Sequence, residues 1–387
     1  ITDRNGEPLA VSTPVESIWA NPQELLRYPE RLPELAKALD VPLDQLTSRL
    51  SQRADKEFVY LKRRINPDQA RAILAHNIPG VFSQREFRRF YPQGEAMAHV
   101  LGFTNIDDRG QEGLELAKRV IRDRHGRIVE NIDLIRPAEP GKDLTLSIDR
   151  RIQFLAYREL RNALATHKAS SGSAVVLDVA TGEILAMVNL PSYNPNAVTG
   201  HNPDARRNRA VTDLVEPGST MKPITVAAAL TAGTARLDTR VDTSPGYMAL
   251  GRFTIRDHHN YGVLDVTGII TKSSNLGPVT LSEPLSAQFF YDFIRRFGYG
   301  SAPQSGFPGE AAGVVLPPSR WNGLTKATMS YGYGLSATAL QVAQAYAALG
   351  NHGRLITPTF VKGQINEARQ VVAPEIADAV VRMMQTV

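Results

Sequence analysis

Two short apolar runs, close together in the chain, constrain the fold more than any other feature. They are Ser173–Val179 and Glu183–Val188, and the turn-forming segment Ala180-Thr181-Gly182 separates them. Runs of this length and composition predict two β-strands in an antiparallel hairpin. Because such strands are apolar on both faces, helices must cover both sides of the hairpin. Two strands do not make a stable sheet unaided, so we expect further strands to join them.

The segments around the hairpin predict these helices. Asp149 is a suitable N-cap for a helix that ends near His167. We expect its apolar face to consist of Ile152, Leu155, Ala156, Leu160, Ala163 and Leu164. A short strand is expected at Leu144–Ile148, and further helices at Thr220–Thr231, Ala337–Leu349 and Pro374–Thr386. The fold class predicted for this part is α/β (α+β), with a central antiparallel sheet flanked by helices.

The chain is long enough for two domains, since it has 387 residues. Pro137–Lys142 breaks any regular element and marks a linker. We therefore predict an N-terminal domain over residues 1–143 and a second domain over residues 144–387. The first domain is polar and irregular, with a turn at Arg4–Glu7 and a helix at Pro67–His76, and it carries no set of residues typical of catalysis.

Charge and composition exclude several classes of function. The formal net charge is +5, and the basic clusters Lys62–Arg64 and Arg85–Arg89 are short, which favours solvated faces over a nucleic-acid partner. The chain has no cysteine, which excludes disulfides and thiolate metal sites. The longest apolar run, Ile224–Ala232, is about half of what a membrane span requires. The chain opens without Met, so we expect that a leader or anchor has been removed.

One stretch combines a candidate nucleophile with a candidate base. In Glu216-Pro217-Gly218-Ser219-Thr220-Met221-Lys222-Pro223, Pro-Gly ends a loop and Ser219 begins a helix. A spacing of three places Lys222 on the same helical face as Ser219. Burial and the positive end of the helix dipole disfavour an ammonium there, so a neutral Lys222 would take the proton of Ser219.

A second motif, Ser273-Ser274-Asn275, follows about fifty residues later. In a Ser-x-Asn segment, alternate side chains can point one way and offer a hydroxyl for proton relay and a carboxamide for an amide substrate. Each motif alone is weak evidence, because a capping serine or a helix-ending turn would look the same. Together, and in this order, they match two of the three motifs of β-lactamases and penicillin-binding proteins.

The chain resembles the class B penicillin-binding proteins, in particular their cell-division members, nearly from end to end. This resemblance implies a penicillin-binding transpeptidase domain behind an irregular α+β pedestal, or dimerisation-like, domain. Besides the two motifs, it rests on Thr2–Gly6, Ile18–Ala20, Arg89–Glu95, His99–Phe103, Gly110–Glu115, Arg207–Ala210 and Tyr331–Gly334.

The resemblance also implies roles for individual residues. Ser219 would attack the penultimate D-alanine carbonyl of a stem peptide ending in D-Ala-D-Ala, with Lys222 as base. Ser273 would pass a proton to the leaving D-alanine, and Asn275 would hold the substrate amide. A β-lactam would acylate Ser219 as a substrate mimic. The residues expected to bind substrate are Glu216, Ser274, Tyr331 and Tyr333.

Partners and location follow from the same resemblance. The implied activity is septal peptidoglycan cross-linking, without cofactor or metal, by a serine-type D-Ala-D-Ala transpeptidase. The implied partners are a membrane glycosyltransferase and other division proteins. The implied location is the bacterial inner membrane, with a single N-terminal anchor and the catalytic domain in the periplasm. The family's third motif, Lys-Thr-Gly or Lys-Ser-Gly, is expected after the last helix, and we expect it to lie beyond Val387.

Other readings of the sequence compete with this one. A non-catalytic penicillin-binding sensor or division scaffold would keep the fold without needing all four motif residues. A soluble β-lactamase would need a placed glutamate for water activation, and none can be assigned. A Ser-His-Asp hydrolase would need Gly-x-Ser-x-Gly, which is absent. The pair His258-His259 predicts a surface turn, because no carboxylate stands as in His-Glu-x-x-His.

Overall fold

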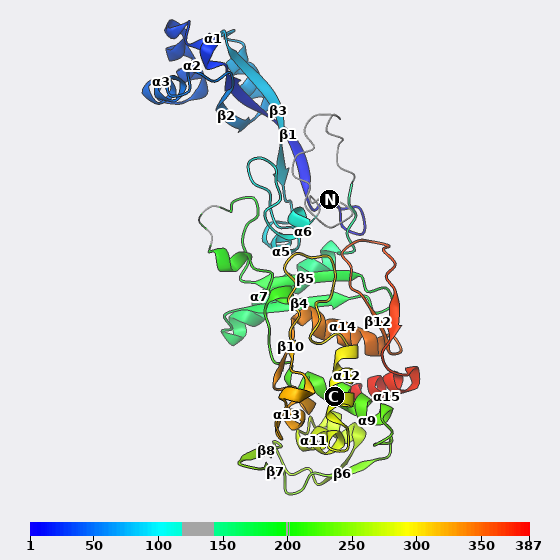
Figure 1. Cartoon of the computed structure of the whole chain (residues 1–387). Helices are drawn as coiled ribbons and strands as arrows, with labels where there is room; N and C mark the ends of the chain where they lie inside the picture. The colour runs from blue at the N-terminus through cyan, green and yellow to red at the C-terminus, as the bar shows by residue number, and fades with distance from the viewer. Residues whose placement is uncertain (118–142, 199, 201) are drawn as a thin grey trace. The chain divides into compact units, whose positions relative to one another are not determined.

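The computed structural model describes residues 1–117, 143–198, 200 and 202–387. The chain forms two compact units, which Figure 1 shows as ribbons. The larger unit contains Ile1–Leu9, Gln93–Phe103 and Gly110–Val387, and the smaller one contains Ala10–Pro92 and Thr104–Arg109. The predicted linker Pro137–Lys142 lies outside the described residues. The boundary at residue 143 stays a prediction.

The smaller unit is a three-stranded antiparallel sheet with helices packed on one face. The sheet order is β2-β1-β3. Ile18, Leu61 and Val81 from the sheet share one hydrophobic core with Leu35 and Leu39. The predicted helix that begins at Pro67 is confirmed, although it ends at Leu74. The helices and strands of the smaller unit are β1 (Val11–Ala20), α1 (Pro22–Leu25), α2 (Leu32–Leu39), α3 (Leu43–Ser51), β2 (Val59–Ile65), α4 (Pro67–Leu74) and β3 (Val81–Phe90).

In the larger unit, the predicted hairpin is present as β4 (Gly172–Leu177) and β5 (Ile184–Leu190), paired antiparallel. Helix α7 (Arg150–His167) packs on one face against Val188 and Leu190. Asn189 faces the other way and bonds with Asn208 and with the backbone of Ala210 in α8 (Arg209–Thr212). The hairpin is thus covered on both faces, as expected. β5 is almost wholly buried, whereas β4 is half-buried along its length.

One local prediction about the start of this unit was only partly right, and another was wrong. Ala156, Leu160 and Leu164 of α7 pack against the core that contains Val188 and Leu190, as predicted. The buried residues of this helix are Gln153 and Tyr157, however, and Leu155 is exposed. Gln153 is buried because its amide binds the carbonyls of Ala96 and Met187, a tertiary contact that apolar periodicity cannot reveal. The segment Leu144–Ile148 forms single bridges to Thr2 and Val361 rather than a strand.

The remainder of the larger unit is mostly helical and surrounds α9 (Lys222–Thr231). This helix is apolar on all sides and buried throughout most of its length, which is typical of a central core helix. Helix α14 begins at Ala339, with Thr338 and Gln341 forming a capping box. Helix α14 spans Ala339–Gly350, and the remaining α-helices of the described part of this unit are α5 (Ala98–Leu101), α6 (Gly113–Ala117), α10 (Val266–Thr271), α11 (Leu276–Ser282), α12 (Ala287–Arg296), α13 (Thr325–Ser330) and α15 (Pro374–Met384).

Four small two-stranded antiparallel sheets complete the described part of this unit. The strand pairs are β6 (Arg240–Asp242) with β9 (Val263–Asp265), β7 (Tyr247–Leu250) with β8 (Phe253–Arg256), β10 (Val314–Val315) with β11 (Leu335–Ser336), and β12 (Arg354–Ile356) with β13 (Ala368–Gln370).

Candidate active site

Ser219 lies in a single turn of 3₁₀ helix, Gly218–Met221, that leads directly into α9. Lys222 is the first residue of α9. In a 3₁₀ turn, side chains three residues apart lie on the same side, so the Lys222 side chain lies on the same side of the turn as that of Ser219. Ser219 is exposed, whereas Lys222 is 2 % exposed. The turn therefore presents a hydroxyl to solvent above a buried amine.

A third residue, Ser273, connects the two groups. The Lys222 Nζ donates hydrogen bonds to the Ser273 Oγ at 3.0 Å and to the Ser273 carbonyl oxygen at 2.5 Å. The Ser273 hydroxyl in turn donates to the Ser219 Oγ at 3.2 Å. The two predicted motifs thus meet in space. The hydroxyl of Ser273, rather than direct contact, links the predicted nucleophile to the predicted base.

Burial changes the acidity of Lys222. Desolvation lowers the pKa of its ammonium to about 8, and the nearby carboxylate of Asp257 opposes this shift. At pH 7 about one lysine in ten is then neutral, far more than for an exposed lysine. This is the direction that the sequence predicted for a general base.

Asp257 fixes the loop that carries Ser273. Its carboxylate accepts hydrogen bonds from the Ser274 hydroxyl at 2.7 Å, from the Asn275 backbone N–H, and from the Leu276 backbone N–H at 3.2 Å. Ser273 itself has a φ of +51°, a conformation that costs free energy in a non-glycine residue. The anchored carboxylate holds Ser273 in this conformation, with its side chain toward Ser219.

The other residues of the second motif have different surroundings. Ser274 is fully buried, and its hydroxyl also accepts a hydrogen bond from the Gly277 N–H at 3.0 Å. This placement supports the loop and does not expose the Ser274 hydroxyl to a substrate. The side-chain amide of Asn275 donates to the Arg256 carbonyl at 2.7 Å, so its oxygen is oriented by β8.

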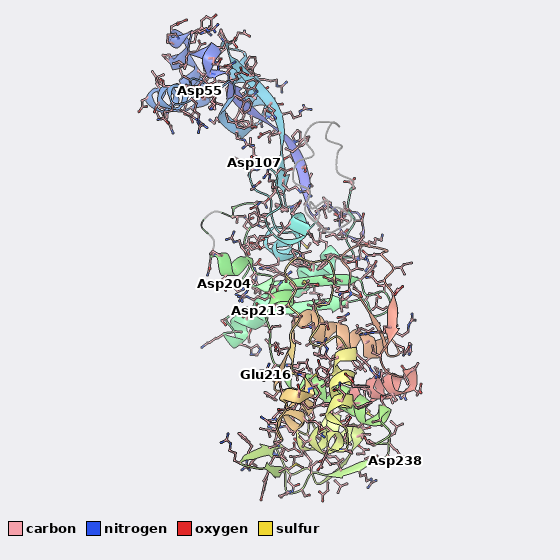
Figure 2. The ribbon with its side chains drawn as sticks, in the orientation of Figure 1. Asp55, Asp107, Asp204, Asp213, Glu216 and Asp238 are labelled. Carbon is pink, nitrogen blue, oxygen red and sulfur yellow. The ribbon has the colours of Figure 1, made fainter. Side chains whose placement is uncertain are left out.

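The segment Tyr331–Gly334 lies directly against the Ser219 turn. The Gly218 N–H donates to the Gly332 carbonyl at 2.9 Å, and a Cβ on Gly332 would come within 1.9 Å of the Gly218 oxygen. Only glycine fits there. Glu216, labelled in Figure 2, accepts from the Gly334 N–H at 2.9 Å. The rings of Tyr331 and Tyr333 lie 5.5 Å apart, and Tyr333 is 48 % exposed.

Tyr346 of α14 contacts the same turn at the residue after Ser219. Its hydroxyl donates to the Thr220 carbonyl at 2.9 Å, and burial raises its pKa to about 12, so it remains protonated. Asp257, Gly332 and Tyr346 were not among the predicted site residues. Gly332 lies within the Tyr331–Gly334 segment of the family resemblance, whereas no local pattern identifies Asp257 or Tyr346, because both act through contacts with residues distant in sequence.

The described residues hold no cluster of three or more possible metal ligands. His258 and His259 are exposed in a bend, as predicted. Within the same described part of the chain, no helix combines the length and apolarity that a bilayer crossing demands.

An exposed serine at the entrance of a buried helix, a buried lysine one turn later and a serine from a distant loop define the class that contains β-lactamases and penicillin-binding proteins. The chain belongs to the penicillin-binding protein family. The model of the penicillin binding protein transpeptidase domain matches residues 172–387, and that of the penicillin-binding protein dimerisation domain matches residues 1–146. The family and the fold class expected from the sequence are thereby confirmed.

Relatives and solved structures agree with this assignment. The peptidoglycan D,D-transpeptidase FtsI of Escherichia coli K12 is 44 % identical over 406 residues, which cover 100 % of this chain and 68 % of FtsI. A probable peptidoglycan D,D-transpeptidase, PenA of Neisseria meningitidis, is 44 % identical over 97 % of this chain, and the chain spans 65 % of PenA's length.

Two crystal structures share the fold. Penicillin-binding protein 3 of Mycobacterium tuberculosis, complexed with aztreonam, has a TM-score of 0.72 at 27 % identity and covers 99 % of this chain and 72 % of its own. A peptidoglycan synthetase of Bifidobacterium adolescentis has a TM-score of 0.77 at 24 % identity, over 100 % of this chain and 79 % of its own.

Proposed function

We propose that this chain belongs to a septal peptidoglycan D,D-transpeptidase, which cross-links stem peptides through an acyl-enzyme on Ser219. The observation that carries the proposal is the hydrogen-bonded set of Ser219, Ser273 and Lys222. It joins an exposed nucleophile to a buried amine of lowered pKa by way of one hydroxyl. General acid–base catalysis requires such contacts within hydrogen-bond reach.

In the first half of the reaction, the Ser219 Oγ attacks the carbonyl carbon of the penultimate D-alanine. The serine proton passes to Ser273, while Ser273 gives its own proton to neutral Lys222. The amide C–N bond then breaks, and the proton held on Lys222 returns through Ser273 to the departing nitrogen of the terminal D-alanine. An ester on Ser219 remains, and the net proton count is unchanged.

In the second half, the amine of another stem peptide attacks the ester carbonyl. Its proton moves through Ser273 to Lys222 and back to the Ser219 oxygen as the C–O bond breaks, which regenerates the serine. The Ser219 backbone N–H contributes to stabilising the oxyanion. Asn275 holds the substrate amide, and Glu216, Tyr331 and Tyr333 form the cleft wall. Ser274 acts indirectly, since its hydroxyl holds the loop to Asp257.

Partners and location belong to the same proposal. A β-lactam acylates Ser219, and a membrane glycosyltransferase and other division proteins work beside the enzyme. The whole protein is anchored in the bacterial inner membrane by one N-terminal segment, with the catalytic domain in the periplasm. The 44 % identity to a D,D-transpeptidase supports these assignments, and the third motif stays a prediction.

Intact-mass analysis of the full-length protein after incubation with benzylpenicillin tests the proposal. We expect one stable covalent adduct, absent in Ser219→Ala and retained in the control Ser170→Ala, which changes an exposed serine before β4. Equal labelling of Ser219→Ala would refute the assignment of the nucleophile. A correctly folded protein that never forms an adduct would favour the non-catalytic scaffold, and rapid hydrolysis of the drug would favour a β-lactamase.

A further inference from the structure

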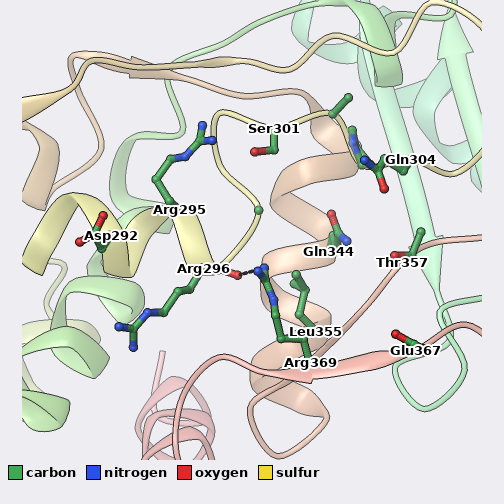
Figure 3. A pocket seen from close by; sticks show the side chains of 13 residues that line it. Asp292, Arg295, Arg296, Ser301, Gln304, Gln344, Leu355, Thr357, Glu367 and Arg369 are labelled. Atoms are coloured by element: carbon green, nitrogen blue, oxygen red, sulfur yellow. Dashed lines mark hydrogen bonds between the residues drawn. The ribbon is translucent and has the colours of Figure 1, made fainter.

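A polar cavity of about 630 Å³ lies in the larger unit and shares no residue with the Ser219 cluster. Its walls are the C-terminal end of α12, the loop around Ser301, the middle of α14 and the β12–β13 hairpin, as Figure 3 shows. This volume falls in the range of small-molecule sites. The proposed transpeptidase chemistry gives the cavity no role.

The charged residues of the wall carry an excess of positive charge. Arg295, Arg296 and Arg369 line the cavity against only two carboxylates, Asp292 and Glu367. Within the described residues, none of these three arginines forms an ion pair with a carboxylate. In the same unit, by contrast, the Arg207 and Arg209 guanidinium groups each pair with neighbouring aspartates.

Two of the arginines are held in place by backbone contacts. The Arg369 Nη2 donates to the Arg296 carbonyl at 2.9 Å, and the Arg295 Nη1 donates to the Gly300 carbonyl. Each guanidinium has five N–H donors, so most donors of both groups remain for a ligand. In Figure 3, the Arg369 side chain points from β13 toward the end of α12. The Arg296 side chain, at that end of α12, points away from Arg369.

The loop around Ser301, which forms one wall of the cavity, is held in place by Gln341 of α14. The Gln341 Nε2 donates to the carbonyls of Ser301 and Ala312, both at 2.8 Å. The neutral side chains of Ser301, Gln304 and Thr357 add hydrogen-bonding groups to the wall. A preformed wall lowers the entropic cost of binding a polar ligand.

We propose that this cavity binds a small ligand that bears an oxyanion, a carboxylate or a phosphate, through Arg295 and Arg369. Guanidinium forks match the geometry of both oxyanions, which favours this chemistry over a neutral ligand. Arg296, whose exposed side chain points away from Arg369, adds a more distant positive charge, and Glu367 opposes binding. The ligand is larger than a bare ion, because the cavity holds several times the volume of one.

Isothermal titration of the full-length protein, at constant ionic strength, tests this site with two probes. Inorganic pyrophosphate represents phosphates, glutarate represents carboxylates, and glutaramide is the neutral control. We expect Arg295→Gln and Arg369→Gln each to raise the Kd about tenfold or more, because each removes a charge-assisted contact. Glu367→Gln should lower the Kd, an improvement that misfolding does not produce.

The matched control is Arg354→Gln, an exposed arginine of β12 outside the cavity wall, which should leave the Kd unchanged. Thermal melts without ligand establish that each variant folds. Binding of pyrophosphate alone assigns a phosphate ligand, and binding of glutarate alone assigns a carboxylate. The proposal is overturned if neither probe binds at about 10 mM, if glutaramide binds equally well, or if folded Arg369→Gln binds unchanged.

Discussion

The Lys222 Nζ lies 3.0 Å from the hydroxyl of Ser273, and the same nitrogen lies 2.5 Å from the Ser273 carbonyl. The buried amine is therefore oriented by a residue of the second motif, fifty-one positions later in the chain. This contact makes the proposed base and the proposed proton relay one unit. Changes at either residue should affect the same step of acylation.

Ser273→Ala removes the hydroxyl between Ser219 and Lys222 and should slow acylation by about 10²–10⁴, the usual contribution of a positioned acid–base group. The carbonyl contact with Lys222 remains, so the fold should be preserved. Stopped-flow measurement of acylation by a chromogenic cephalosporin gives the rate. Lys272→Ala, an exposed neighbour, is the control, and an unchanged rate in Ser273→Ala would exclude the relay.

The acylation rate should rise with pH and level off above about 8. The lowered pKa of Lys222, about 8, means that the neutral base increases as the pH rises through that value. Asp257→Asn removes the carboxylate that raises this pKa, so the midpoint should move to lower pH. A pH–rate profile of both proteins measures the midpoints. A midpoint that stays in place would show that another group controls the profile.

Gly332→Ala should destabilise the protein and abolish acylation, because its Cβ would meet the Gly218 carbonyl at 1.9 Å. Gly334→Ala is the matched control: its φ is also positive, +79°, but the nearest atom lies at 3.5 Å. The control should lose only about 1–3 kcal/mol through backbone strain. Urea denaturation measures both free energies of unfolding, and equal losses would contradict the steric argument.

His99 should make stability depend on pH in acid. It is buried and binds the Ala205 carbonyl at 2.8 Å, and desolvation lowers its pKa to about 4. The unfolded chain binds this proton near pH 6.5, so this contribution to stability is complete above 6.5 and is lost as the pH falls through 4. Between these two pH values, the free energy of unfolding changes by up to about 1.4 kcal/mol per pH unit.

Thermal melts between about pH 7.5 and about pH 5 measure this slope, because that range includes the ordinary histidine pKa of about 6.5. His99→Gln should have a smaller slope, although its stability at neutral pH is lower. His259→Gln, at an exposed histidine, should keep the original slope. If His99→Gln also keeps the original slope, groups other than His99 are responsible for the loss of stability in acid.

The sequence by itself determined the elements whose cause is local. The β4–β5 hairpin follows from two apolar runs and a turn, and α7 begins where Asp149 caps it. The three-residue spacing of Ser219 and Lys222 places them on one side of a single turn. Such features depend on backbone geometry over a few residues, which residue types specify directly.

Only the tertiary structure decided how the distant segments meet. Asp257 anchors the second motif from the end of another hairpin, and Gly332 and Tyr346 hold the Ser219 turn through its Gly218 and Thr220 backbone groups. The prediction for the buried face of α7 missed Gln153 for the same reason, since this residue is buried by partners far away in the chain. These contacts depend on the paths of long loops, and a pattern of neighbouring residues does not encode those paths.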